Sequence, residues 1–321
     1  MATVLAVAAL AGGVALVVVG AEVFAEHLEA ASRRLGVSAF ALALLLAGAE
    51  PEELATTVTA SLRKVPAIAF GDVIGANIAM CLVALPVGAL VAPLPFGHRV
   101  RWYALLALPL GVVAAIVMWN GHVGRLAGAL LVALYVAYVA AIWLRERQPP
   151  ALGEVAELAA GDAGDDEEVP RSRRVGRELA LVLAGVAALA IGSIVLVQAT
   201  RSISGVESTQ TNLSLTLVGF ATTLELVVLA WSSARRGVTE AVVAAVVGSF
   251  AYNATMSLGA AALARPLSIS AADLLHGPAV VMLAALAAVI AIAVPRRRLG
   301  RAGGVALLAS YPVFVLYIAL R

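Results

Sequence analysis

The segment AGAEPEELATTVTASLRKVPAIAFGDVIGANIAM, residues 47–80, decides how this sequence is interpreted, because it sets carboxylates inside a stretch that is otherwise apolar. Glu50, Glu52 and Glu53 directly follow the apolar run 40–46. The chain has 321 residues, of which 62% are hydrophobic and 13% charged, whereas a typical soluble domain is about 45–50% apolar and about 25% charged. This is the composition of a helical membrane protein, in which carboxylates need a role that offsets their desolvation.

Ten apolar stretches approach the length of about 20 residues that a helix needs to cross hydrocarbon. Five precede and five follow one long polar connector, at 2–22, 37–61, 66–92, 102–119, 125–144, 178–198, 212–233, 240–263, 276–294 and 303–320. The first lacks a basic start, so we expect no cleaved signal peptide. We predict an all-α polytopic membrane protein of about ten transmembrane helices.

The connector divides the chain into an N-terminal five-helix repeat (1–144), an acidic cytoplasmic linker (145–177) and a C-terminal five-helix repeat (178–321). Because five is odd, the second unit enters the membrane with the opposite polarity, and homologous halves then form an inverted repeat.

The basic residues predict the orientation. If the N-terminus is outside, 16 of the 22 lysines and arginines fall in cytoplasmic connectors and 6 on the other side. Cytoplasmic loops carry an excess of basic residues, so we predict a multi-pass protein of the cell membrane with its N-terminus outside. The single cysteine, Cys81, excludes an internal disulfide and a multi-cysteine metal site.

A second polar segment matches the first. Residues 220–253, FATTLELVVLAWSSARRGVTEAVVAAVVGSFAYN, align without gaps to 47–80 at an offset of 173. The identities are Glu52/Glu225, Arg63/Arg236, Val65/Val238, Val73/Val246 and Gly75/Gly248. Both segments form the second and third helices of their halves, so we predict that Glu52 and Glu225 face one central cavity.

These segments are rich in the oxygen ligands that hard cations prefer. Calcium takes six to eight oxygens from carboxylates, carbonyls, amides and water. Pro51 removes a backbone hydrogen bond beside the carboxylates, and a broken helix there would free carbonyl oxygens. We predict a cation site formed by Glu50, Glu52, Glu53, Thr222, Thr223, Glu225, Ser249 and Asn253, with Asp72 and Asn77 as secondary candidates.

The two segments resemble the cation/calcium exchanger superfamily, which includes sodium/calcium and proton/calcium exchangers. Its repeats carry G-T-S-x-P-E and then G-N/D-x-x-G-S-N-I-x-N/D. GAEPEE with GDVIGANI resembles the first repeat, and ATTLELVVLAWSSARRG with VVGSFAYN resembles the second. The resemblance implies ten helices with the N-terminus outside.

The resemblance also implies the roles of particular residues. It places the two central glutamates at Glu52 and Glu225, the hydroxyl pair at Thr222 and Thr223, and the later serine and amide at Ser249 and Asn253. Matching the Pro-Glu pair selects Glu52 in the first repeat, whereas a gapless match from Gly48 selects Glu53, and both alternatives stay open.

The departures from the pattern bear on ion choice. Ala76 replaces the serine of the first repeat, Met80 replaces its Asn or Asp, and Glu50 stands near a hydroxyl position. Clustered carboxylates resist joint ionisation, so protons could take part in the exchange.

The sequence therefore predicts a secondary antiporter that exchanges calcium for sodium or protons by alternating access. One alternative is an exchanger of another cation coupled to protons or sodium, and another is a non-transporting membrane receptor or scaffold. The chain has no H-E-x-x-H, G-x-S-x-G or nucleotide loop. We expect neither an enzyme nor a bound cofactor nor a nucleic-acid partner, only inorganic cations and the lipid bilayer.

Overall fold

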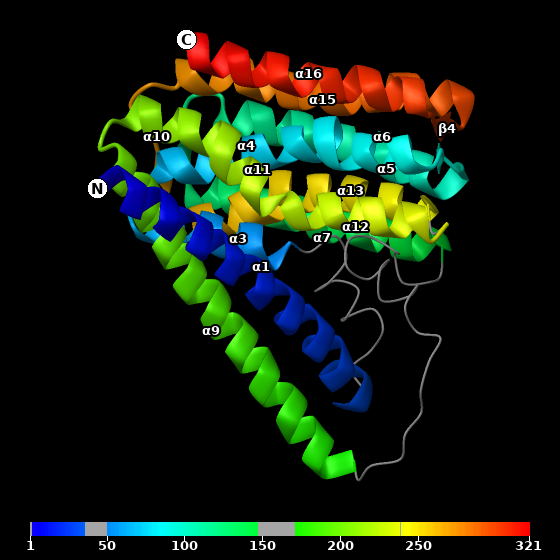
Figure 1. Ribbon diagram of the computed structural model, residues 1–321, viewed down its shortest axis with the longest axis horizontal. Helices are drawn as coiled ribbons and strands as arrows, with labels where there is room; N and C mark the ends of the chain where they lie inside the picture. The colour runs from blue at the N-terminus through cyan, green and yellow to red at the C-terminus, as the bar shows by residue number, and fades with distance from the viewer. Residues whose placement is uncertain (1, 36–49, 147–170, 238) are drawn as a thin grey trace.

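The computed structural model describes residues 2–35, 50–146, 171–237 and 239–321, which form a bundle of long helices (Figure 1). Nine helical stretches in these ranges are long and apolar enough to cross a membrane: 5–28, 66–91, 98–118, 125–145, 176–203, 207–235, 242–264, 273–296 and 301–319. This confirms the prediction of an all-α polytopic membrane protein. The described part of the tenth expected span is α3 (Pro51–Leu62), while residues 37–49 and most of the expected linker lie outside the described ranges.

The first half begins with one long helix and continues with shorter ones. Its elements are α1 (Ala2–Leu35), α3 (Pro51–Leu62), α4 (Pro66–Ala79), the π-helix η1 (Met80–Ala84), α5 (Leu85–Val91), β1 (Leu94–Pro95), α6 (His98–Met118), β2 (His122–Val123) and α7 (Arg125–Glu146).

The second half repeats this order. Its elements are α9 (Arg171–Ile203), α10 (Glu207–Leu213), the π-helix η2 (Ser214–Val218), α11 (Gly219–Thr222), α12 (Leu224–Arg235), α13 (Thr239–Tyr252), the π-helix η3 (Asn253–Ser257), α14 (Leu258–Ala264), β3 (Leu267–Ser268), α15 (Asp273–Arg296), β4 (Arg298–Leu299) and α16 (Arg301–Leu320).

The bounds of five consecutive elements agree between the halves at the offset of 173. The elements α3, α4, η1, α5 and β1 become α12, α13, η3, α14 and β3 with every first and last residue shifted by that number. Even the turn after α3 is repeated, because Lys64 and its counterpart Gly237 both have positive φ, 61° and 82°. The internal repeat is therefore present in the structure as well as in the sequence. Its offset rises to 176 by β2 and β4, since α15 has 24 residues where α6 has 21.

Two short β-ladders indicate that the two halves are inverted relative to each other. Strand β1 pairs with β4 and β2 pairs with β3, both antiparallel, so each ladder joins one strand from each half. Helix α6 separates β1 from β2 by about 31 Å at 1.5 Å per residue, close to the thickness of a hydrocarbon core. Strands β1 and β2 of the first half correspond to β3 and β4 of the second. A rotation that superposes one half on the other therefore places the β1–β4 ladder on the β2–β3 ladder at the opposite end of the bundle, as a two-fold axis in the membrane plane requires.

Helices α1 and α9 pack against each other along one side of the bundle (Figure 1). A Cβ on Gly13 would lie 2.8 Å from the Leu196 nitrogen, and a Cβ on Gly20 would lie 2.8 Å from the Leu189 nitrogen. The backbones thus touch, as small residues allow between membrane helices. Seven residues further along α1, His27 Nδ1 lies 2.6 Å from Glu178 Oε2.

These two helices also extend beyond the expected spans 2–22 and 178–198. Backbone hydrogen bonding continues a helix past the point where hydropathy falls, so the apolar pattern alone underestimates its length.

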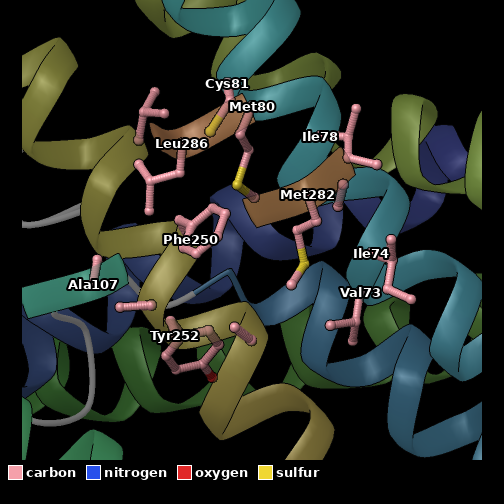
Figure 2. Packing of buried hydrophobic residues seen from close by; sticks show 14 of the residues in the cluster. Val73, Ile74, Ile78, Met80, Cys81, Ala107, Phe250, Tyr252, Met282 and Leu286 are labelled. Carbon is pink, nitrogen blue, oxygen red and sulfur yellow. The ribbon is translucent and has the colours of Figure 1, made fainter. Parts of the chain in front are cut away.

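An apolar cluster from both halves fills the middle of the bundle (Figure 2). Met80 of η1, Phe250 of α13 and Met282 of α15 are each fully buried there. Met80 therefore packs in the core, as expected for a residue that replaces a polar ligand.

Candidate cation-binding site

The two predicted central glutamates hold equivalent positions. Helix α3 begins at Pro51 and α12 begins at Leu224, so Glu52 and Glu225 are each the second residue of a helix. Backbone N–H groups at a helix N-terminus favour a negative charge. Glu225 interacts electrostatically with Glu50, Glu52 and Glu53. The structure therefore brings carboxylates from both halves together, with Glu52 only 1% exposed and Glu225 partly exposed.

Glu50 connects this cluster to the third helix of the second half. Its carboxylate accepts a hydrogen bond from the hydroxyl of Ser249 in α13. The carboxyl of Glu52 lies beside that of Glu50, and two carboxyls can share a hydrogen bond only when one of them carries a proton. A bound cation would satisfy the same pair of groups without a proton.

Asn253 is one turn beyond Ser249 and starts the π-helix η3. It is fully buried, and neither its oxygen nor its nitrogen has a hydrogen-bond partner within the described ranges. Buried amides normally find partners, and single-turn π segments occur frequently at functional sites. The Asn253 side chain thus has no partner that would compete with a cation, and its role as a ligand stays a prediction.

Thr222 and Thr223 lie where the second helix of this half is interrupted. Helix α11 ends at Thr222 and α12 begins at Leu224, although no proline is present. The Thr223 hydroxyl donates to the Gly219 carbonyl at 2.6 Å. A hydroxyl whose proton is used in this way still has lone pairs for a cation. The matching interruption expected at Pro51 would involve residues before Glu50, which lie outside the described ranges.

The two secondary candidates, Asn77 and Asp72, have different partners. Asn77 is fully buried and donates weakly to the sulfur of Met282, 3.6 Å away. Asp72 accepts from the hydroxyls of Thr57 and Thr222, so it joins α3, α4 and α11. The contact between Thr57 and Asp72 was not predicted from the sequence. One signal could have indicated this contact: Thr57 and Asp72 are polar, whereas their counterparts in the second half, Ala230 and Ala245, are apolar.

Close backbone packing brings these elements together. A Cβ on Gly75 of α4 would lie 2.4 Å from the Leu215 carbonyl oxygen, and a Cβ on Gly219 would lie 2.4 Å from the Ala76 nitrogen. Gly75 and Gly219 are therefore close-packing positions. Only glycine allows this approach, which brings Thr222 to Asp72.

Acidic groups alone do not complete a metal site. Within the part of the chain that the structure describes, no three histidine, cysteine or acidic side chains converge closely enough to hold a metal ion. A bound cation would therefore need the hydroxyl and amide oxygens described above.

Comparison with known families identifies the chain. The sequence pattern of the family described as sodium/calcium exchanger protein matches residues 5–144 and 178–320. The chain belongs to the sodium/calcium exchanger family. This confirms the superfamily that the two polar segments resemble.

Two relatives are similar to this chain. The chain is 27% identical over 271 residues to the inner membrane protein YrbG of Escherichia coli, covering 82% of this chain and 81% of the relative. It is 33% identical over 84 residues to the sodium/calcium exchanger MaX1 of Methanosarcina acetivorans, covering 26% of this chain and 24% of that protein.

Solved structures share the fold of this exchanger-family chain. The sodium–calcium exchanger NCX_Mj superposes with a TM-score of 0.60 at 22% identity, covering 99% of this chain and all of the other. The H⁺/Ca²⁺ exchanger CAX superposes with a TM-score of 0.71 at 17% identity, covering 98% of this chain and 81% of the other.

The structural repeat bears on which first-half glutamate serves the exchanger site. At the offset of 173 the counterpart of Glu52 is Glu225, whereas the counterpart of Glu53 is Leu226. The gapless alternative would thus place a leucine at the corresponding position of the second half. The arrangement favours Glu52 as the central ligand, which stays a prediction.

Proposed function

We propose that this exchanger-family protein is a secondary antiporter that moves calcium against sodium or protons. One observation carries the proposal: equivalent glutamates of two inverted repeats, Glu52 and Glu225, lie within electrostatic reach of each other inside the helical bundle. Carboxylates in a membrane interior are costly, and a cation that binds between them would offset that cost.

Alternating access is the transport mechanism that the architecture suits. The two halves share one fold and cross the membrane in opposite directions, so a change that opens one side in one half can occur on the other side in the other half. Solved relatives described as a sodium–calcium exchanger and an H⁺/Ca²⁺ exchanger support calcium as the substrate and sodium or protons as the coupling ion.

We further propose that the protein lies in the cell membrane with its N-terminus outside. Most basic residues then face the cytoplasm, including those that follow β1 and those around β4. The Escherichia coli relative is described as an inner membrane protein. In this orientation the β1–β4 ladder is cytoplasmic. The transported cations and the lipid are then the partners, with no bound cofactor and no enzymatic activity.

Proton coupling, or transport of a different cation, is favoured by Glu50. Its counterpart in the second half is Thr223, so the first half offers a titratable group where the second offers a hydroxyl. A proton could compete with a cation for this carboxylate, which no hydroxyl allows.

Radioactive calcium counterflow in proteoliposomes tests the function. Sodium and pH gradients are imposed independently, so that each coupling ion is assessed separately. We expect calcium uptake driven by at least one outward gradient and none without a gradient. Cation flux of another kind would favour the alternative substrate, and the absence of any flux would support a non-transporting member.

A further inference from the structure

Arginines from both halves gather at one corner of the bundle, at the end where Figure 1 labels β4. The β1–β4 ladder brings the start of α6 next to the turn between α15 and α16. The Phe96 nitrogen extends this contact, because it donates to the Arg297 carbonyl oxygen at 2.9 Å. We call the arginines of these two segments the arginine corner: Arg99, Arg101, Arg296, Arg297, Arg298 and Arg301.

Several guanidinium groups of the arginine corner are not used by the fold. Within the described ranges, the side chains of Arg101, Arg297 and Arg298 form no hydrogen bond or ion pair. Arg301 differs, since its Nε donates to the Leu90 carbonyl oxygen at the end of α5 at 3.1 Å. Arg297 and Arg298 are also exposed, so their positive charges are available to a ligand.

Glu240 of α13 is an acidic side chain at the same corner. A Cβ on Gly97, directly before α6, would lie 3.0 Å from a carboxylate oxygen of Glu240. This carboxylate can balance only one of the positive charges. The corner therefore keeps an excess of positive charge, which attracts anions.

The corresponding turn at the opposite end of the bundle has the same backbone without this charge. At the offset of 176, residues 296–298 correspond to 120–122, which are Asn-Gly-His. Gly121 has a φ of 67° where Arg297 has 53°, and the Ile269 nitrogen donates to the Gly121 carbonyl oxygen at 2.9 Å, as in the other ladder. Glycine is the usual residue at positive φ, so the fold does not require arginine at this turn.

Exposed apolar side chains continue from the arginine corner along two helices. Leu105 of α6 is 44% exposed and lies one turn after Arg101, and Val305 of α16 is 56% exposed and lies one turn after Arg301. Residues four apart share a helix face. Each face thus carries a guanidinium group next to an apolar surface, which matches the two parts of a phospholipid, an anionic headgroup and its acyl chains.

We propose that the arginine corner binds the headgroup of an anionic phospholipid, whose acyl chains lie along α6 and α16. Basic residues orient a membrane protein wherever they stand in its cytoplasmic loops, and this role does not require arginines of both halves to converge. Basic pockets between membrane helices on the cytoplasmic side bind anionic headgroups. Only the choice of the cytoplasmic leaflet rests on the proposed orientation. Because the ladder joins the two halves, the bound lipid stabilises their contact at this end.

Thermal unfolding of the purified, delipidated full-length protein in a neutral detergent tests this site. Dioleoyl phosphatidylglycerol, dioleoyl phosphatidylcholine and inorganic phosphate are titrated separately, and native mass spectrometry counts the lipids that stay bound. The main variant, Arg296→Asn/Arg297→Gly/Arg298→His, gives this turn the residues of its counterpart, whose backbone is the same. Arg265→Gln is the matched control, because Arg265 is exposed beside β3 in the other ladder.

We expect phosphatidylglycerol to stay bound and to raise the unfolding temperature, and phosphatidylcholine and inorganic phosphate to do neither. Each arginine near an anionic lipid contributes about fivefold in affinity, so the triple variant should bind phosphatidylglycerol about 100-fold more weakly. Arg265→Gln should bind it as wild type does. Equal stabilisation by phosphatidylcholine would overturn the proposal, as would equal stabilisation by phosphate, which would show a site for free anions. Undiminished phosphatidylglycerol binding by the triple variant would overturn it as well.

Arg101→Gln tests the site without changing the ladder, and it decides the question if the triple variant does not fold. Arg101 lies in the first turn of α6. We expect phosphatidylglycerol to bind about fivefold more weakly, with the unfolding temperature in the absence of lipid unchanged. Wild-type affinity in this variant would contradict the proposed position of the lipid along α6.

Discussion

Glu52 and Glu225 occupy the same place in two copies of one structural unit, each as the second residue of a twelve-residue helix that ends at a basic turn. The two units run in opposite directions, so the pair meets near the axis that relates them. A cation bound between these carboxylates would be held in the same way from either side, as a transporter that opens alternately to each side requires.

Neutralising the central pair should stop transport. We expect Glu52→Gln and Glu225→Gln each to reduce initial calcium exchange below about one hundredth of wild type, since even indirect partners of a metal are worth 10–100-fold in affinity. Glu53→Gln should be the mildest of the three. The measurement is uptake normalised to inserted protein, with the exposed Glu240→Gln as control. An inactive Glu53→Gln beside a fully active Glu52→Gln would select the gapless alternative.

Replacing Glu50 by its counterpart should alter pH dependence. Protons compete with cations for a carboxylate, so wild-type exchange should slow as pH falls. In Glu50→Thr the hydroxyl does not titrate, and the rate should vary less between pH 6 and pH 8. Initial rates at fixed ion gradients measure this. If both proteins follow the same pH profile, Glu50 does not contribute to proton competition.

Asn253 should contribute to cation affinity more than to stability. Both of its polar groups lack partners among the described residues, so Asn253→Ala loses no hydrogen bond that the structure contains. We expect calcium affinity to fall about tenfold, with a loss of stability below about 2 kcal/mol, because the truncation leaves a small cavity and breaks no hydrogen bond among the described residues. Isothermal titration and thermal unfolding in detergent measure the two effects. The exposed Asn120→Ala serves as control, and a purely structural Asn253 would give the reverse outcome.

Adjacent glycines of α1 should respond differently to one added methyl group. A Cβ on Gly13 would meet the backbone of α9 at 2.8 Å, whereas a Cβ on Gly12 would meet nothing within 4 Å. We expect Gly13→Ala to destabilise the protein by about 1–3 kcal/mol through overpacking, and Gly12→Ala to be neutral or slightly stabilising. Thermal unfolding compares them. Equal stability of both variants would show that α1 and α9 are not in contact.

The two ladders should be reached from opposite sides of the membrane. His122 of β2 and Arg298 of β4 are both exposed, and the single native cysteine is buried. In intact cells, a membrane-impermeant thiol reagent should label His122→Cys and spare Arg298→Cys until the membrane is opened. Labelling of both variants from outside would contradict the inverted arrangement, and the opposite pattern would reverse the proposed orientation.

Much of this architecture could be predicted from composition and periodicity. Apolar length locates most of the helices because the bilayer imposes it, and five identities were enough to find an offset that the helix bounds then matched. The π segments η1 and η3 could not be predicted, since a change of hydrogen-bond register leaves little trace in hydropathy.

The contacts between individual residues of the site could not be predicted from the sequence either. Thr222 contacts Asp72 across 150 positions, and only the close approach of Gly75 to the other half makes that contact possible. The pairing of Glu52 with Glu225 was predictable because both repeats carry it. The contacts of Asp72 with Thr57 and Thr222 were not, because only one repeat carries an aspartate at this position.

The crossed pairing of β1 with β4 and β2 with β3 also concerns biogenesis. Neither half can complete a ladder from its own strands, and the apolar cluster draws on both. A ribosome that has released only the first five helices has therefore made an intermediate with unpaired edges, exposed to quality control until the second half arrives. Because the first half leaves both of its strands unpaired, we expect premature truncation to lead to degradation of the fragment.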